Sequence, residues 1–154
     1  NDPAKPFGFL MEASMLGVGV GFDDKGADKD FSIYEPLKTE NPNVYIIPDT
    51  REGWVESLRA LLDSYSLGTA KVEFDYSEIR AEGVPIKGFG GESSGPKPLI
   101  ELHEKCISIL DNEIGQPISI TSIVDIMNLI GKYLHGSKPH LVGGLKIKSL
   151  MMTF

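Results

Sequence analysis

The chain has 154 residues, of which 41% are hydrophobic and 24% are charged, and its formal net charge is −7 at pH 7. This composition suits a single globular domain over residues 1–154 with a buried core, and it excludes the broad basic surface that nucleic-acid or anionic-membrane binding requires. The single cysteine, Cys106, excludes an internal disulfide, and no apolar run of about 18 residues is present that could cross a membrane as a helix.

The first two predicted elements are a helix and a glycine-rich strand. Residues 7–16 favour a short helix that ends at Gly17. The stretch GVGVGF at 17–22 then alternates glycine with apolar residues, so a strand here would carry side chains on one face only. Glycine weakens a strand, and close approach is the usual reason to keep it there. Two explanations stay open: tight packing against a neighbouring element, or a bare wall beside a nucleotide-sized ligand.

A strand and a well-marked helix follow a polar loop. Residues 23–43 predict the loop, and residues 44–49 predict a strand that ends near Pro48. Asp49 and Glu52 resemble a capping box, so we expect the helix to begin there and to end at Gly68. Five apolar residues recur at helical spacing on one face of this helix. They are Trp54, Leu58, Leu61, Leu62 and Tyr65.

The second half of the chain continues to alternate strands and helices. Residues 70–76 predict a strand, and residues 77–98 predict a long loop with apolar residues threaded through it, which is typical of a functional loop rather than a linker. A helix over 97–114 places Cys106 on its apolar face. A second helix over 121–134 is apolar nearly all round, which predicts burial. The alternation indicates an α/β fold with partly parallel strands.

The two ends of the sequence lead to further expectations. No basic and then apolar leader opens the chain, so we expect a cytoplasmic protein. The first residue is Asn1 rather than Met, and residues 150–154 form an apolar run. We therefore expect the chain to be a piece of a longer protein.

The strongest candidate for chemistry is GFGGESSGPKP at 88–98. Glycines let backbone N–H groups converge, two serines add hydroxyls, and Pro96 is a residue type favoured at the first position of a helix. A glycine-rich loop before a helix is a ready anion site, although Glu92 opposes an anion and a flexible connector without ligand stays the alternative. The residues that we expect closest to a ligand are Gly90, Gly91, Ser93, Ser94 and Gly95.

Other site patterns fit less well. The phosphate-loop and dinucleotide patterns both fail in this loop. Residues 91–95 do match Gly-x-Ser-x-Gly, the nucleophile elbow of serine hydrolases, with His135 and His140 downstream, but no clear strand precedes the motif. His103 and Cys106 are three apart on a helix, yet two more metal ligands are missing, so we expect no metal site.

Three separated stretches resemble the large catalytic subunit of ribonucleotide reductases, in the order of that family. They are FLMEASMLGVGVGF, FDYSEIRAEGVPIKGFGGESSGP and SIVDIMNLIGK. The sequences REGW and FDYSEIR are most similar to the adenosylcobalamin-dependent (class II) branch. The resemblance covers roughly residues 6–133, which is most of the chain.

The resemblance implies a fold, a reaction and a set of partners. The fold would be part of a ten-stranded α/β barrel, with GVGVGF as one strand beside the nucleotide site. The parent enzyme would convert ribonucleotides to deoxyribonucleotides by radical chemistry that adenosylcobalamin initiates. We expect this piece to supply nucleotide-binding wall without holding the cofactor alone. Its partners would be a ribonucleotide substrate, a nucleotide effector, and the remaining reductase chain or a complementary subunit.

The sequence also departs from the family pattern. The family's Asn-x-Cys-x-Glu motif and its pair of reducing cysteines are absent, so we expect no catalytic residue here and no activity from the isolated chain. Residues 134–154 diverge, with Lys146 and Lys148 where the family has arginines. The effector-loop candidates are Arg80, Gly143, Gly144 and Lys146. A stand-alone or split nucleotide-binding or docking module is the alternative function, and a serine hydrolase is the third.

Overall fold

The computed structural model describes residues 2–22, 31–41, 43–87, 91–134 and 150–152. These residues form four helices and four short strands. The helices are α1 (Lys5–Met15), α2 (Arg51–Ser66), α3 (Lys97–Asp111) and α4 (Ile120–Leu134). The strands are β1 (Val20–Phe22), β2 (Asn43–Ile46), β3 (Val72–Asp75) and β4 (Leu150–Met152).

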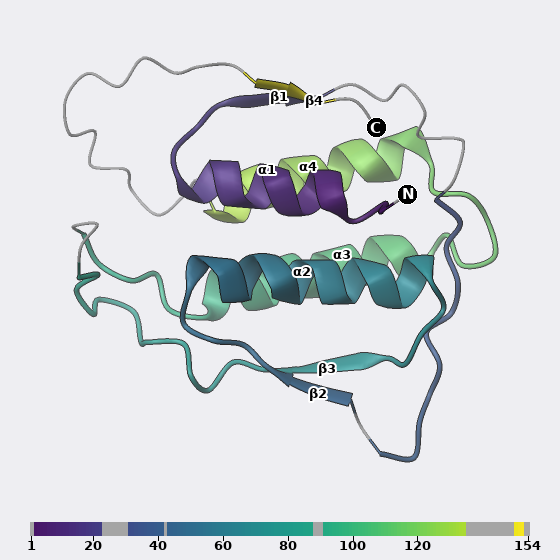
Figure 1. Cartoon of the computed structure of the whole chain (residues 1–154), viewed down its shortest axis with the longest axis horizontal. Coiled ribbons are helices and arrows are strands. Elements are labelled where there is room, and N and C mark those ends of the chain that lie inside the picture. Colours follow the sequence, from purple (N-terminus) through teal and green to yellow (C-terminus); the bar gives the residue numbers. More distant parts are fainter. Residues whose placement is uncertain (1, 23–30, 42, 88–90, 135–149, 153–154) are drawn as a thin grey trace.

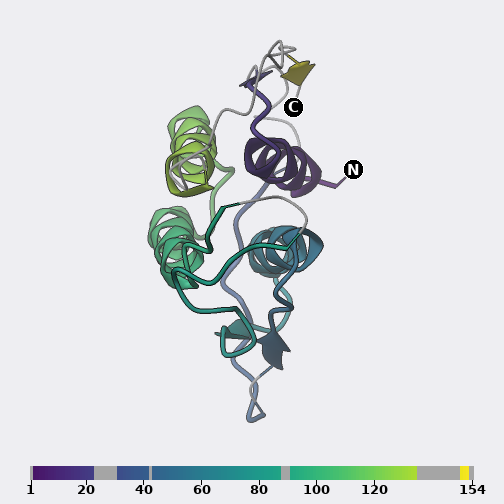
Figure 2. The same cartoon turned by 90° about the vertical axis from the view of Figure 1, so that its left-hand side faces the viewer.

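The elements stack in layers. The helices α1 and α4 lie side by side above α2 and α3, so that each helix packs against two others around a square (Figure 1). The β1–β4 pair covers the upper helix layer, and the β2–β3 pair covers the lower one, as the end-on view shows (Figure 2). None of the helices in the described part of the chain is long and apolar enough to cross a membrane.

Both pairs of strands are parallel, which confirms the predicted α/β class with parallel pairing. In the register of β1 and β4, Val20 is opposite Leu150, and in that of β2 and β3, Tyr45 is opposite Phe74. The helix α2 connects β2 to β3, so these three elements form one βαβ unit. The described residues form two separate two-stranded sheets, and the ten-stranded barrel stays a prediction.

The GVGVGF stretch is shorter as a strand than we predicted. Only Val20–Phe22 is strand, because the first residues of the stretch complete the end of α1. Gly17 has φ +73°, the left-handed conformation that glycine adopts without a Cβ clash, and the N–H of Val18 returns to the carbonyl of Ala13 at 2.9 Å. The glycine at 17 therefore serves the helix end rather than a bare strand face.

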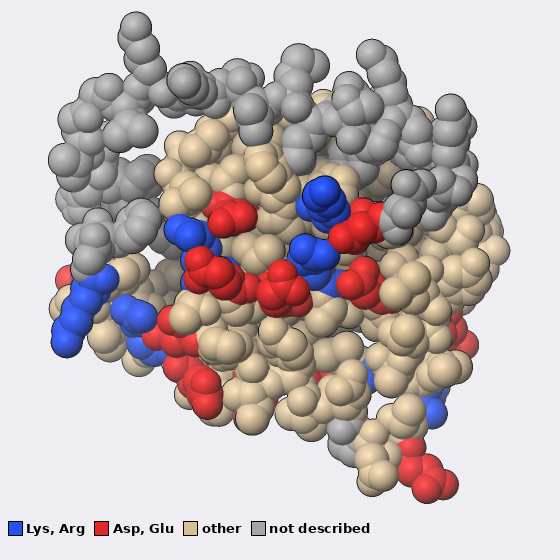
Figure 3. Space-filling model, viewed as in Figure 1, with Lys and Arg blue, Asp and Glu red and all other residues tan. Residues whose placement is uncertain are grey.

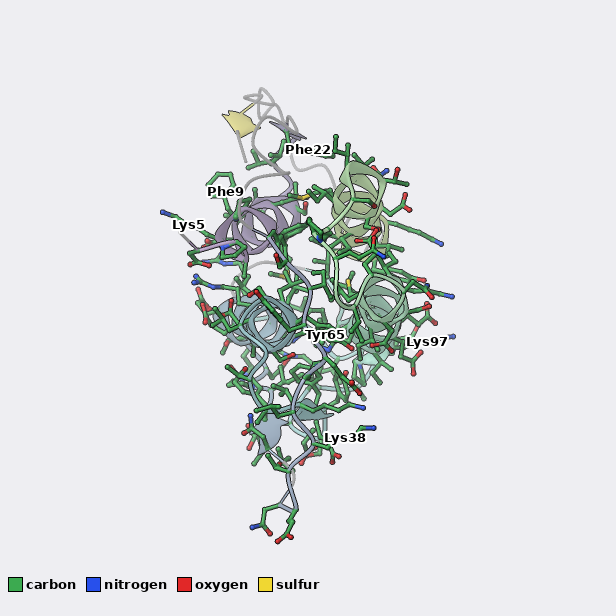
Figure 4. All side chains as sticks on the ribbon, turned by 90° about the vertical axis from the view of Figure 1, so that its right-hand side faces the viewer. Lys5, Phe9, Phe22, Lys38, Tyr65 and Lys97 are labelled. Carbon is green, nitrogen blue, oxygen red and sulfur yellow. The ribbon has the colours of Figure 1, made fainter. Side chains whose placement is uncertain are left out.

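The core lies between the four helices. The predicted apolar face of α2 is confirmed, since Leu58 and Leu62 are fully buried, although Trp54 is only half-buried. Figure 4 shows Tyr65 pointing into the interior, while the labelled lysines point outward. The Tyr65 hydroxyl donates to a carboxylate oxygen of Asp111 at 2.6 Å, which ties α2 to the end of α3.

Two details of the helices differ from the prediction. The N-cap of α2 is Thr50, whose side chain accepts the N–H of Gly53 at 2.9 Å, and Asp49 has another partner described below. The helix α4 buries one face only. Its polar residues Asp125, Asn128 and Lys132 recur at helical spacing and form an exposed stripe, which the predicted all-round burial overlooked.

Candidate functional site

The candidate site lies where β2 and β3 end. Because these strands are parallel, their carboxyl ends meet at one edge, and the N–H of Ile47 still donates to the carbonyl of Asp75 at 2.9 Å beyond the strand ends. Residues 47–50 leave this edge toward α2, and residues 76–96 leave it toward α3. In α/β sheets, ligands bind outside the carboxyl ends of the strands, so this edge is where the geometry favours a site.

An ion pair joins the two segments that leave this edge. Arg80 donates from Nε to Oδ2 of Asp49, and both side chains are about one-third exposed or less. Sequence reasoning missed this pair and assigned Asp49 to a helix cap. The available signal was that each residue follows a predicted strand, and that parallel pairing brings such residues together.

The predicted long loop between β3 and α3 is a hydrogen-bonded hairpin. Pro85 and Glu92 form an antiparallel bridge, and the N–H of Ile86 donates to the carbonyl of Gly91 at 2.9 Å. The N–H of Ser93 donates to the carbonyl of Val84 at 2.8 Å. Residues 83–86 are therefore paired with residues 91–93, and the loop has a defined shape on both of these arms.

Ser93 is the centre of the hydrogen bonds in this hairpin. Its carbonyl accepts the N–H of Gly83 at 2.9 Å, in addition to the bond that its N–H makes. Its hydroxyl donates to the carbonyl of Arg80 at 3.4 Å and accepts the N–H of Gly95 at 3.0 Å. The hydroxyl is thus engaged within the loop, whereas the half-buried hydroxyl of Ser94 has no hydrogen-bond partner among the described residues.

Two glycines of the loop occupy left-handed backbone conformations. Gly91 has φ +96° at an exposed position where a Cβ would meet open space. Gly95 has φ +70° and is buried, and a Cβ there would lie 3.1 Å from the backbone nitrogen of Glu82. Gly95 is therefore required by both its conformation and close approach, while Gly91 is required by its conformation alone.

The start of α3 offers fewer anion donors than we expected. Pro96 is the N-cap, and Pro98 lies in the first turn, so neither residue has an N–H to donate. The N–H groups of Leu99 and Ile100 both donate to the carbonyl of Pro96, at 3.1 and 3.0 Å. Among the described residues this leaves the N–H of Lys97 as the first-turn donor without an acceptor. A ligand here would depend on the loop and Arg80 more than on the helix.

His103 belongs to the core and is not a metal ligand. Its Nδ1 lies 2.8 Å from the hydroxyl of Tyr76, its Nε2 lies 3.2 Å from the hydroxyl of Ser57, and its ring centre lies 4.4 Å from that of Phe74. Burial lowers the pKa of His103 to about 3, so the imidazole is neutral. The described residues contain no group of three or more His, Cys, Asp or Glu that could hold a metal ion.

The remaining residues that the sequence analysis singled out lie either in the described part of the structure or outside it. Burial raises the pKa of the Cys106 thiol to about 12, in keeping with its predicted place in the core. The serine-hydrolase alternative gains no support, because the Ser93 hydroxyl is engaged within the loop, and the two histidines that it named, His135 and His140, lie outside the described residues. Several predicted residues lie outside the described residues: Gly90, His135, His140, Gly143, Gly144, Lys146 and Lys148.

Comparison with known proteins decides the family. Residues 22–110 match the family model described as the insertion domain of B12-dependent ribonucleotide reductase. The chain belongs to the B12-dependent ribonucleotide reductase family. The resemblance inferred from the motifs is thereby confirmed. The match places β2, α2, β3 and α3, together with the hairpin loop, in the insertion domain of this reductase family.

Individual relatives and one solved structure agree with this assignment. The chain is 58% identical to the adenosylcobalamin-dependent ribonucleoside-triphosphate reductase of Euglena gracilis, over 84% of this chain and 18% of the relative. It is 52% identical to the probable enzyme of that name from Dictyostelium discoideum, over 85% of this chain and 19% of the relative. A crystal structure of a B12-dependent (class II) ribonucleotide reductase shares the fold, with TM-score 0.66 and 24% identity over 97% of this chain and 24% of that one. The chain thus spans about a fifth of the length of the curated reductases that it matches.

Proposed function

We propose that this chain is a segment of an adenosylcobalamin-dependent ribonucleotide reductase that supplies part of a nucleotide-binding wall. The parent enzyme would convert ribonucleotides to deoxyribonucleotides by radical chemistry. The observation that supports the wall most directly is the hydrogen bonding between the described arms of the hairpin, residues 80–87 and 91–95, which follow the carboxyl ends of two parallel strands and lie within the insertion-domain match.

Three groups on the described arms of the hairpin suit a phosphate-bearing ligand. Arg80 donates to Asp49 from Nε, and its terminal nitrogens have no acceptor among the described residues. A planar guanidinium with two free nitrogens matches the oxygens of a phosphate. The hydroxyl of Ser94 is available as a further donor. Gly91 is exposed and has no side chain, so a ligand can approach its backbone closely.

The described residues do not fit adenosylcobalamin, which belongs elsewhere in the parent enzyme. When bound, this cofactor initiates the radical chemistry. The groove between α3 and α4 measures ≈ 300 Å³, at the lower end for ligands far smaller than a corrinoid. The imidazole of His103 has both ring nitrogens occupied in the core and cannot reach a cobalt ion. We therefore assign no cofactor contact to the part of the chain that the structure describes.

The β1–β4 pair points to the surroundings of the segment in the parent enzyme. Parallel sheets occur almost only as larger sheets with both faces covered, and a pair of three-residue strands is far below that size. We propose that β1 and β4 are neighbouring strands of the ten-stranded barrel, and that β2 and β3 belong to the insertion domain beside it. The remainder of the reductase chain, the ribonucleotide substrate and a nucleotide effector would then be the partners, in the cytoplasm.

A titration followed by backbone-amide NMR tests the nucleotide wall. Ribonucleoside di- and triphosphates are added to the 154-residue chain, and the amides of residues 80–95 should shift before those of α2. We expect weak binding, about millimolar, because only part of the site is present. Shifts that are confined to residues 143–148, with the hairpin unchanged, would contradict the proposal.

A further inference from the structure

We propose that Asp49 is a positioning residue for the hairpin loop, acting through Arg80. The carboxylate fixes the direction of the guanidinium, and the backbone of Arg80 in turn fixes Ser93 at the base of the hairpin. The identity of the ligand rests on the proposed nucleotide-binding function, but the effect of Asp49 on the shape of the loop does not.

Asp49 stands on a tightly packed turn. The N–H of Thr50 donates to the carbonyl of Pro48 at 2.8 Å, and the side chain of Thr50 caps α2 by accepting the N–H of Gly53. A Cβ on Gly53 would lie only 2.6 Å from the carbonyl oxygen of Pro48, so the turn and the first turn of α2 approach as closely as the backbone allows. The backbone of the turn that carries the Asp49 carboxylate therefore has little freedom to move.

Arg80 transmits this fixed position to the hairpin. Its side chain pairs with Asp49, while its carbonyl accepts the hydroxyl of Ser93, whose own backbone groups close the hairpin with Gly83 and Val84. The preceding residue, Ile79, is buried in the core, which holds the backbone of Arg80 from the other side. Hydrogen bonds thus run continuously from the start of α2 to Gly95, just before α3 begins.

A positioning role and a purely electrostatic role of Asp49 predict opposite changes in anion binding when Asp49 is removed. A carboxylate beside an anion site repels the anion, so its removal should strengthen binding if charge alone decided the result. Asp49 engages Nε of Arg80 on one side of the planar guanidinium, which leaves the end-on edge formed by the two terminal nitrogens open to an anion. Without Asp49 the side chain of Arg80 gains rotamer freedom and the hairpin loses one anchor. We therefore expect removal of Asp49 to weaken anion binding, which is the opposite of the Coulomb effect.

The first experiment measures amide hydrogen exchange in the ligand-free chain. In Asp49→Asn, the amides of Gly83, Ile86 and Ser93 should exchange about fivefold faster, as expected for loss of a partly exposed ion pair. Asp2→Asn is the matched control, because Asp2 pairs with Arg59 at 2.7 Å on the α1–α2 face and carries the same charge. Figure 3 shows acidic and basic side chains interspersed along that face. The control should leave the hairpin amides unchanged, and Asp49→Glu should restore most of their protection.

The second experiment titrates the same variants with ATP. Asp49→Asn should weaken the ATP-induced shifts of the hairpin amides about fivefold, whereas Asp2→Asn should not. Unchanged hairpin exchange, or tighter ATP binding in Asp49→Asn, would overturn the positioning role. If ATP fails to shift the hairpin even in the wild-type chain, the nucleotide wall fails as a function. The exchange measurement still decides whether Asp49 positions the loop.

Discussion

The hydroxyl of Tyr76 and Nδ1 of His103 lie 2.8 Å apart and join the end of β3 to the middle of α3. On the other side of the ring, the hydroxyl of Ser57 lies 3.2 Å from Nε2 and adds α2 to the same cluster. A neutral imidazole has one donor and one acceptor nitrogen, so two hydroxyl groups satisfy it completely. This buried cluster fixes β3 on the helices, and the connection from β3 to α3, which contains the hairpin, begins at the residue after Tyr76.

His103 should make the stability of the chain depend on pH. Burial lowers its pKa from 6.5 to about 3, so between these values the unfolded chain binds a proton that the folded chain does not. His103 should therefore cause no loss in the free energy of unfolding well above pH 6.5, and an increasing loss as the pH falls below that value. The loss from this residue should be about 2 kcal/mol at pH 5.

Urea unfolding at pH 7 and pH 5 measures this effect, with His103→Gln as the comparison. The variant removes the titrating group, so its stability should change less than that of the wild type between the two values, even though it is less stable at pH 7. An equal change in both proteins would show that other groups cause the dependence.

Cys106 should behave as a small core residue. Cys106 lies on the buried face of α3 and is fully buried. Burial raises the pKa of its thiol to about 12, so almost no thiolate exists at pH 8. Native protein should react with a thiol reagent far more slowly than urea-unfolded protein. Replacement by alanine should lower the free energy of unfolding by about 1 kcal/mol. Rapid labelling without denaturant would place the thiol at the surface.

The elements that sequence reasoning located well are those with a strong period. The apolar spacing in α2 and α3 and the alternation around Phe74 arise from local geometry, and both are visible in the chain itself. The errors arise where tertiary contacts decide. Asp49 and Thr50 are both residue types that favour the N-cap position. In the structure Thr50 is the N-cap, and the side chain of Asp49 pairs instead with Arg80, 31 residues away.

The sequence predicts which loop is the candidate site, and that prediction is still to be tested; the sequence does not predict how the loop is folded. The glycines and serines of the loop indicate it, because glycines let backbone N–H groups converge and serines add hydroxyl donors. The sequence could not reveal that Ser93 pairs with Val84, Gly83, Arg80 and Gly95, because a hairpin within an irregular loop has no periodic signal. Nor could it show that two prolines at the start of α3 remove backbone donors that an anion site would use.

The isolated chain should not reduce ribonucleotides. The parent reaction, as the family resemblance implies it, uses several cysteines, and the only cysteine here is buried in the core. With adenosylcobalamin, a dithiol and a ribonucleoside triphosphate, no deoxynucleotide should form above the protein-free background. Measurable product from the pure 154-residue chain would require a catalytic group that the family resemblance does not provide.

Two neighbouring serines should have different effects on the loop. Ser93→Ala removes the hydroxyl that bonds to the carbonyl of Arg80 and the N–H of Gly95, so the hairpin should loosen in the absence of ligand. Ser94→Ala removes a hydroxyl that has no partner among the described residues, so it should leave the free loop unchanged and weaken nucleotide binding. Each variant is the matched control for the other, because both make the same chemical change one residue apart.

Amide exchange in the free chain and nucleotide titration by NMR separate the two roles. Ser93→Ala should raise the exchange of Gly95 and Gly83 by about fivefold, the equivalent of about 1 kcal/mol for one or two weak hydrogen bonds. Ser94→Ala should leave that exchange unchanged and reduce the shifts caused by ATP. The reverse result, with Ser94 controlling the free loop and Ser93 controlling only the binding, would mean that the Ser93 hydroxyl leaves Arg80 and Gly95 to meet the ligand.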